Sequence, residues 1–148
     1  MKIVLDADVL IGALDGSDPH HSQTRVLFTA WHRGETTLLT SVVNLSEVLV
    51  APDADHGRFR RARAAIVALG VAIHQPSEAI GVEAARLRRA HPISLPDAYC
   101  LATARHVDAS MTSFDQKIIR AARAEGIQVA ASPAMATSQR TRPRRDRR

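Results

Sequence analysis

The stretch IVLDADVL, residues 3–10, places two acidic residues directly after a short apolar run. Residues 3–5 are aliphatic and rich in β-branched side chains, which is typical of a strand buried on both faces of a parallel sheet. Asp6 ends this run, and the apolar residues after Asp8 indicate a short helix that ends before Gly16. A carboxylate at the carboxyl end of such a strand stands where open α/β sheets bind ligands, although an aspartate there is also a common helix N-cap.

The rest of the chain alternates short strand-like runs with helical segments. Strands are predicted at residues 3–5, 36–40, 71–74, 109–112 and 127–131. The segment after the second strand begins with the capping residue Ser41 and is apolar on most sides, which predicts a buried helix. This alternation favours an α/β fold, a three-layer sandwich with a central, mostly parallel five-stranded sheet and helices on both faces.

Length and composition limit the class of protein. The 148 residues suffice for one domain with its own core. The single cysteine, Cys100, excludes an internal disulfide and fits a reducing compartment. No apolar run reaches about eighteen residues, and Asp6 and Asp8 interrupt the one at the N-terminus, so we expect neither a membrane span nor a signal peptide. We therefore expect a cytoplasmic protein.

The net charge of +5 is concentrated at the C-terminus. Residues 140–148 contain six arginines and one aspartate, whereas residues 1–139 carry 14 basic and 14 acidic groups. We expect residues 135–148 to form a disordered basic tail. Two roles stay open for it, namely contacts with nucleic-acid phosphates or simply solubility. The arginines considered for phosphate contacts are Arg140, Arg142, Arg144 and Arg145.

Four acidic residues occupy places that converge in such a sheet, and they are Asp6, Glu47, Asp97 and Asp115. Asp6 and Asp115 follow predicted strands, while Glu47 and Asp97 lie in helices after the second strand and before the fourth. If the fourth strand lies beside the first, all of these acids meet at the carboxyl edge of the sheet. Each aspartate is also placed to cap a helix, and Glu47 could instead lie on an exposed stripe with Asn44.

The composition of this acidic set predicts its chemistry. Carboxylates this close together cannot all stay ionised unless a cation offsets their repulsion. Oxygen ligands without His or Cys favour Mg²⁺ or Mn²⁺ over zinc. Since the set contains no nucleophile of its own, the predicted nucleophile is a metal-bound water.

Four segments carry a resemblance to a known family, and they are IVLDADVLIGAL, SVVNLSEVL, LPDAYCLATA and MTSFD. In this order and spacing they resemble the acidic motifs of PIN-domain ribonucleases. The size is similar to that of the VapC toxins of bacterial type II toxin–antitoxin pairs. The resemblance covers about residues 1–131 and implies a PIN-like nuclease domain, which we place at residues 1–134, followed by the basic tail.

The resemblance implies that the catalytic, metal-binding carboxylates are Asp6, Glu47, Asp97 and Asp115. Ser113 would be the hydroxyl residue that often precedes the last acid. Asp8 stands where the family often has Ser, Thr or Asn, so its role is open, and we class both residues as supporting. The implied reaction is hydrolysis of RNA phosphodiester bonds with Mg²⁺ or Mn²⁺, leaving 5′-phosphate and 3′-hydroxyl ends. The implied partners are an RNA substrate, a VapB-type antitoxin that covers the acidic pocket, often with an arginine, and a second copy in a homodimer.

Three alternatives remain open. Asp6-Ala7-Asp8 is also the D-x-D pattern of haloacid-dehalogenase-like phosphatases, with Asp6 as covalent nucleophile, but neither Lys2 nor Lys117 is well placed to hold a phosphoryl group. A phospho-accepting receiver domain shares the sheet type and the acidic pocket but lacks here the lysine expected after the last strand. The third alternative is a non-catalytic module that binds RNA through its arginine tail.

Two expectations concern recognition of the substrate. Aromatic residues make up 3% of the chain, so base stacking offers little basis for reading sequence, and we expect RNA shape and backbone to decide. His20 and His21 are adjacent on a predicted helix with no third ligand nearby, so we expect both at the surface and not in a metal site.

Overall fold

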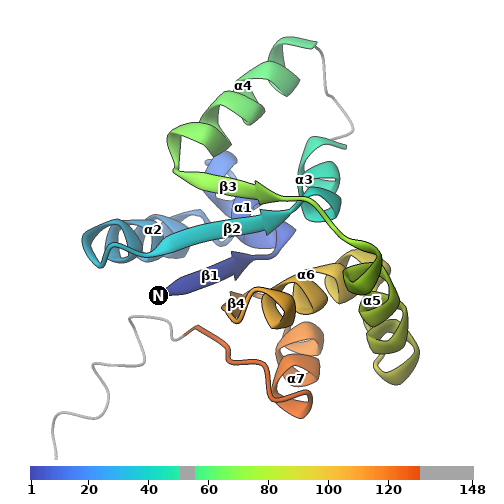
Figure 1. Ribbon diagram of the computed structural model, residues 1–148. Helices are drawn as coiled ribbons and strands as arrows, with labels where there is room; N and C mark the ends of the chain where they lie inside the picture. Colours follow the sequence, from blue (N-terminus) through green and yellow to red (C-terminus); the bar gives the residue numbers. More distant parts are fainter. Residues whose placement is uncertain (51–55, 131–148) are drawn as a thin grey trace, which may run out of the picture.

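Strand β1, Lys2–Leu5, lies inside a parallel sheet of four strands in the order β3-β2-β1-β4 (Figure 1). The structure is a computed structural model and describes residues 1–50 and 56–130. Strand β2 covers Thr37–Ser41, β3 covers Val71–His74 and β4 covers Ser110–Thr112. All neighbouring strands pair in parallel. Because β4 pairs with β1, the strand order reverses between them, as the convergence of the acids requires.

The prediction of a fifth strand is wrong. Residues 127–130 meet β4 only at an isolated parallel bridge between Met111 and Val129. Met111 N donates to Gln128 O at 2.8 Å, and Ala130 N donates to Met111 O at 2.8 Å. Strand β4 has three residues, and the chain then turns toward the acids, so this side of the sheet offers no longer ladder in the described part. Residue 131, the predicted strand end, lies outside the described residues.

Helices pack on both faces of the sheet, as predicted. They are α1 (Ala7–Leu14), α2 (His21–Arg33), α3 (Val42–Leu49), α4 (His56–Ala68), α5 (Glu78–Ala90), α6 (Leu95–His106) and α7 (Gln116–Ala124). Figure 1 shows α5, α6 and α7 gathered on one side of the sheet, and α3 at the carboxyl ends of the strands. Within the described residues, no helix has the length and apolarity needed to cross a lipid bilayer.

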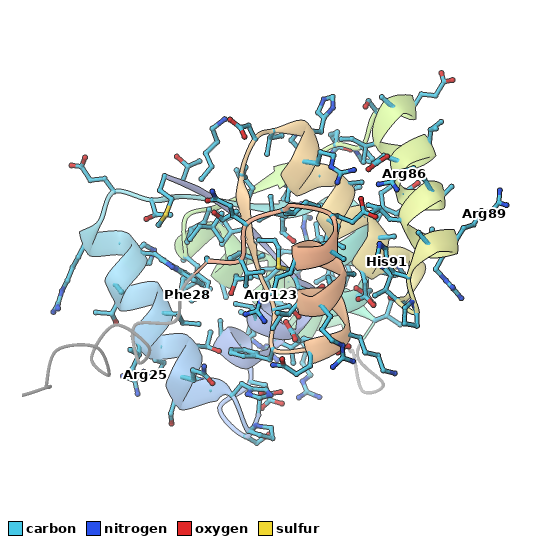
Figure 2. The ribbon with its side chains drawn as sticks, turned by 90° about the horizontal axis from the view of Figure 1, so that it is seen from below. Arg25, Phe28, Arg86, Arg89, His91 and Arg123 are labelled. Carbon is cyan, nitrogen blue, oxygen red and sulfur yellow. The ribbon has the colours of Figure 1, made fainter. Side chains whose placement is uncertain are left out.

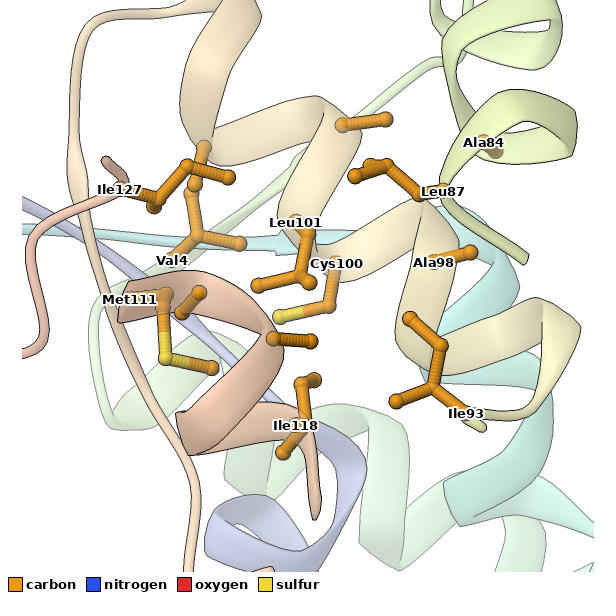
Figure 3. Close-up of a cluster of buried hydrophobic side chains, with 14 of the residues drawn as sticks. Val4, Ala84, Leu87, Ile93, Ala98, Cys100, Leu101, Met111, Ile118 and Ile127 are labelled. Carbon is orange, nitrogen blue, oxygen red and sulfur yellow. The ribbon is translucent and has the colours of Figure 1, made fainter. Parts of the chain in front are cut away.

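Alternate side chains of β1 point into two apolar cores, one on each face of the sheet. Ile3 and Leu5 pack with α1, α2 and α4, while Val4 packs with α5, α6 and α7. Figure 3 shows the second core, in which Leu101 and Cys100 of α6 are fully buried. Burial raises the pKa of the Cys100 thiol well above its ordinary value, so this cysteine is a packing residue and not a nucleophile. Burial on both faces explains the continuous apolar run in the sequence.

Helices α1 and α2 approach each other closely at Gly12. A Cβ atom on this residue would lie 2.6 Å from Thr24 Oγ1. His21 Nδ1 lies 2.8 Å from the Gly12 carbonyl oxygen, which ties the start of α2 to α1. Glycine therefore permits the contact that brings the start of α2 close to the carboxyl end of β1.

One carboxylate ties the end of α7 to α5 and α6. Glu125 accepts hydrogen bonds from Arg86 Nη2 at 2.6 Å and from Arg105 Nη2 at 2.9 Å, and His91 Nε2 lies 2.6 Å from its Oε1. Arg105 Nη2 also donates to the Glu125 carbonyl at 2.7 Å. The hydrogen bond from Arg86 is the largest of several causes that lower the pKa of Glu125 to about 2. Figure 2 shows Arg86 and His91 on this side of the molecule.

Glu125→Gln is expected to make stability less sensitive to acid. A carboxylate whose pKa falls on folding contributes stability above its ordinary pKa of 4.5 and loses it as the pH drops toward 2. We expect the variant to lose about 1 kcal/mol of unfolding free energy near neutral pH, and this difference from wild type to shrink at about pH 3. Urea unfolding followed by circular dichroism at both pH values measures it. An equal loss at both would contradict the prediction.

Candidate active site

Asp6 lies at the carboxyl end of β1, where the chain turns into α1. Asp6 is only 4% exposed. Its Oδ1 accepts hydrogen bonds from Ala7 N at 2.8 Å and from Asn44 Nδ2 at 3.2 Å, and its Oδ2 accepts one from Ser113 Oγ at 2.8 Å. Asp6 is thus the N-cap of α1 and also a buried acid at the strand end. The N-cap interpretation is confirmed, while a role of Asp6 in binding a ligand stays a prediction.

The surroundings of Asp6 disfavour its ionised form. Burial, followed by the nearby charge of Asp8, raises the pKa of Asp6 from 3.8 to about 8, and Asp97 adds to the rise. Hydrogen bonds from Ser113 and Ala7 act in the opposite direction and do not offset it. A buried carboxyl group among like charges becomes easier to ionise when a cation lies beside it.

Asn44 connects three parts of the site. It is fully buried on α3, and its Nδ2 donates to Asp6 Oδ1 at 3.2 Å, to Glu47 Oε2 at 3.3 Å and to the Pro96 carbonyl at 3.2 Å. The sequence leaves open an exposed stripe of Glu47 and Asn44, and the structure exposes Glu47 but buries Asn44. In the sequence, the signal for this role of Asn44 is its position, three residues before Glu47 in a helix whose other residues are mainly apolar.

Glu47 and Asp97 come to the site from α3 and α6. The Glu47 side chain is largely exposed, but part of it is shielded from solvent. This partial burial raises its pKa, and the charges of Asp97 and Asp8 add to the rise. Asp97 Oδ2 accepts a hydrogen bond from Ser94 N at 2.8 Å, while Ser94 Oγ accepts one from Asp97 N at 3.2 Å. This reciprocal pair confirms the predicted capping box of α6. Asp97 therefore caps a helix and also contributes to the negative potential around Asp6.

Asp8 holds the loop that follows β4. Its Oδ2 accepts hydrogen bonds from Phe114 N at 2.7 Å and from Asp115 N at 3.1 Å, and it lies 3.0 Å from Ser113 Oγ. Its Oδ1 is buried and has no hydrogen-bond partner among the described residues. Burial raises the pKa of Asp8, and the hydrogen bonds from the loop oppose that rise. The acid whose role the sequence left open thus positions the segment that carries Ser113 and Asp115.

Ser113 and Asp115 occupy this loop in different ways. Ser113 Oγ lies 2.8 Å from Asp6 Oδ2 and 3.0 Å from Asp8 Oδ2, and it accepts a hydrogen bond from Asp115 N at 3.0 Å. The Asp115 side chain is exposed, and its Oδ1 accepts a hydrogen bond from Lys117 N at 2.7 Å, which makes it the N-cap of α7. The backbone of Asp115 is therefore held by Asp8 and Ser113, while its carboxylate is exposed to solvent and caps α7.

The atoms that could coordinate a metal ion at this site suit a hard divalent cation such as Mg²⁺. All are oxygen atoms. Beside them, Asp8 Oδ1 and Asn44 Oδ1 are buried without a hydrogen-bond partner among the described residues, so they can accept hydrogen bonds from the waters that Mg²⁺ keeps. In residues 1–50 and 56–130, no three Asp, Glu, His or Cys side chains are arranged to hold an ion together. Mg²⁺ does not need such a cage, because it usually keeps several waters and binds one or two carboxylates together with substrate phosphates.

Several predicted features lie outside the described residues. They are the domain boundary at residue 134, the basic tail, and the arginines Arg140, Arg142, Arg144 and Arg145. Their contacts with nucleic acid stay predictions.

Comparisons with known proteins give a match to one family model and several solved structures of similar fold. A family model for the PIN domain matches residues 3–124, a span that contains Asp6, Glu47, Asp97 and Asp115. A comparison with curated protein sequences finds no match.

Solved structures with a similar fold include VapC20 from Mycobacterium tuberculosis, a toxin that cleaves the sarcin-ricin loop. It is 18% identical, with a TM-score of 0.67 over 80% of this chain and 94% of that chain. A toxin–antitoxin complex from Klebsiella pneumoniae is 23% identical, with a TM-score of 0.63 over 79% and 89% of the two chains. VapBC2 from Rickettsia felis, bound to a DNA fragment from its promoter, is 13% identical, with a TM-score of 0.69 over 88% and 98%. At these identities the likeness concerns the fold.

Proposed function

Since the chain belongs to the PIN domain family, which its match over residues 3–124 shows, we propose that it is a divalent-metal-dependent endoribonuclease. The observation that carries this proposal is Asp6, buried at the carboxyl end of β1 among further carboxylates, with a pKa of about 8. Bare carboxylates would repel a phosphodiester, so a cation must accompany the substrate. The acids that we propose for metal binding are Asp6, Glu47, Asp97 and Asp115.

The chain's own residues prepare the site for in-line hydrolysis. A bound Mg²⁺ or Mn²⁺ would supply Lewis-acid chemistry, activating water and offsetting the phosphate charge. Asn44 and Ser113 hold the two carboxylate oxygens of Asp6, so that this ligand does not rotate. Asp8 keeps the loop after β4 against α1. This preorganisation limits the reorganisation needed at the moment of reaction.

Cleavage of a total RNA pool tests the proposed activity. We expect the purified chain to cut RNA with Mg²⁺ or Mn²⁺ and to stop in EDTA, since a bound metal would supply the activation of water. Hydrolysis that breaks the bond between phosphorus and the 3′ oxygen leaves 5′-phosphate and 3′-hydroxyl ends. The ends are identified by selective ligation and sequencing. Release of phosphate from small phosphoesters without any RNA cutting would instead support the phosphatase alternative.

We also propose that the chain is a toxin neutralised by an antitoxin, in line with the complexes from Klebsiella pneumoniae and Rickettsia felis. A groove of about 660 Å³ between α1, α3 and α4 is the surface that we propose for this partner. Ile11, Val50 and Phe59 line it and are 37%, 77% and 39% exposed. Glu47 also lines this groove. An antitoxin segment with apolar side chains and an arginine would therefore fill the groove and reach Glu47.

The remaining expectations stay part of this proposal. We propose the cytoplasm as the compartment, because RNA and an antitoxin of this kind occur together there. A homodimer is supported by the family resemblance alone. The arginine tail is proposed to add phosphate contacts that are independent of RNA sequence.

A further inference from the structure

We propose that a cavity beside the acids binds one nucleotide of the RNA, next to the bond that is cut. This inference rests on the ribonuclease function proposed above. The cavity has a volume of about 930 Å³ and lies between α2, α7, residues 112–114 and residues 126–130. Ser113, whose hydroxyl donates to Asp6, is part of its wall. Ser113 therefore connects the cavity to Asp6.

An aromatic pair forms the wall nearest to the acids. The rings of His20 and Phe114 are stacked, with centroids 4.1 Å apart and an interplanar angle of 11°. Phe114 N donates to Asp8, so the backbone that carries this ring is fixed by the acid that fixes Asp115. All bases of single-stranded RNA can stack on such surfaces, and differences in stacking strength give a modest preference among them. His20, which the sequence predicts only as a surface residue, thus stacks on Phe114.

A cation and several amides line the remaining walls. Arg123 of α7 is exposed, and its guanidinium group makes no hydrogen bond or ion pair with the part of the chain that the structure describes. Arg86, in contrast, is paired with glutamates on the other side of α7. Figure 2 shows Arg123 on the side of α7 that faces α2. Gln23, Gln116 and Gln128 offer both donors and acceptors to a base edge.

The combination fits a nucleotide better than an apolar or a purely anionic ligand. An aromatic surface suits the base, an arginine suits a phosphate, and amides suit the base edge or the ribose hydroxyls. Phe114 follows Ser113 directly in sequence, so a base stacked there belongs to a nucleotide adjacent to the phosphate at Asp6. The cavity would therefore contribute both affinity and a preference for the base next to the cut.

Two substitutions test the cavity without touching the acids. Phe114→Leu removes the ring but keeps the backbone N–H that Asp8 binds, and Phe114→Tyr keeps the ring as a conservative control. Arg123→Gln removes the cation. Arg120→Gln is its matched control, because Arg120 lies on the same helix, is exposed and does not line the cavity. The probe is a fluorescent random RNA of about ten nucleotides, measured by anisotropy with Ca²⁺ in place of Mg²⁺, so that a cation offsets the charge of the acids. A gel run after each titration checks that the probe stays uncut.

We expect Phe114→Leu to weaken binding of the probe by about tenfold and Phe114→Tyr to restore most of the affinity. Arg123→Gln is expected to weaken binding several-fold and to lower the slope of log affinity against log salt by about 0.7, the value for one phosphate contact on a single strand. Arg120→Gln should leave this slope unchanged. Sequencing of cut ends from a random RNA pool should show that Phe114→Leu alters base preference at one position beside the cut.

The outcomes separate this inference from the proposed activity. If the wild-type chain cuts RNA while Phe114→Leu and Arg123→Gln keep its affinity and base preference, the cavity is not a nucleotide site and the ribonuclease proposal stands. If the wild-type chain binds the probe through these residues but cuts no RNA, the cavity proposal stands and the ribonuclease proposal fails. A wild-type chain that does not bind the probe overturns the cavity proposal.

Discussion

Asp6→Asn is expected to abolish RNA cleavage and, at the same time, to stabilise the metal-free protein. The loss of activity should be roughly 10³-fold, because the buried carboxylate is the proposed central ligand of the cation. Asparagine keeps the shape of the side chain and an acceptor for Ala7 N. The variant should therefore fold, and its inactivity would report on charge and metal binding.

The gain in stability follows from the direction of the pKa shift. The pKa of Asp6 is raised from 3.8 to about 8 in the fold, so the folded state holds this proton more tightly than the unfolded state. The stability that this group contributes is fully present below about pH 4 and is lost as the pH rises through 8. Asparagine cannot ionise, so near pH 8 we expect the variant to exceed the metal-free wild type by about 2 kcal/mol.

Thermal unfolding with and without Mn²⁺ tests both parts of this prediction. In EDTA near pH 8 the variant should melt roughly 5 °C above wild type, and Mn²⁺ should raise the melting temperature of wild type but not of the variant. Asp108→Asn is a matched control on an exposed aspartate in a left-handed turn that asparagine also tolerates. If Asp6→Asn cleaved RNA at the wild-type rate, Asp6 would not be a metal ligand.

Asp8→Ala is expected to reduce cleavage by about 100-fold through loss of position rather than loss of a ligand. The change removes the acceptor for Phe114 N and Asp115 N, and the loop after β4 would no longer be held against α1. Phe114 N would lose its acceptor, while Asp115 N would keep only Ser113 Oγ, and we expect this to cost about 2 kcal/mol of stability. A displacement of Ser113 and Asp115 by about 1 Å is enough for an activity loss of this size.

Asp8→Asn separates a positioning role from metal binding. Its carbonyl oxygen can still accept from Phe114 N and Asp115 N, so we expect most of the activity and stability to return. RNA cleavage rates and urea unfolding of Asp8→Ala and Asp8→Asn, measured side by side, give the comparison. A loss in Asp8→Asn as large as that in Asp6→Asn would assign Asp8 to the metal instead.

Features that depend on neighbours in sequence could be predicted without a structure. The buried strand before Asp6, the capping box of Ser94 and Asp97, and the cap at Asp115 all follow from local patterns, and the structure confirms them. The fifth strand, in contrast, was wrongly predicted from such a local pattern. Its pattern is apolar, but pairing depends on the partner strand, and β4 provides only Met111 for a bridge with Val129.

The sequence by itself determined the fold class and placed acids at the ends of elements that converge, because strand and helix periods and caps are local properties. Only the tertiary structure decided what those acids contact. Asp8 meets Phe114 across 106 positions, and Asn44 meets Asp6 across 38. Such contacts depend on the order of the strands and on the packing of α1 and α3 against them. No local pattern encodes that packing. The hydrogen bond from Phe114 N to Asp8 and the stacking of His20 on Phe114 are therefore visible only in the folded chain.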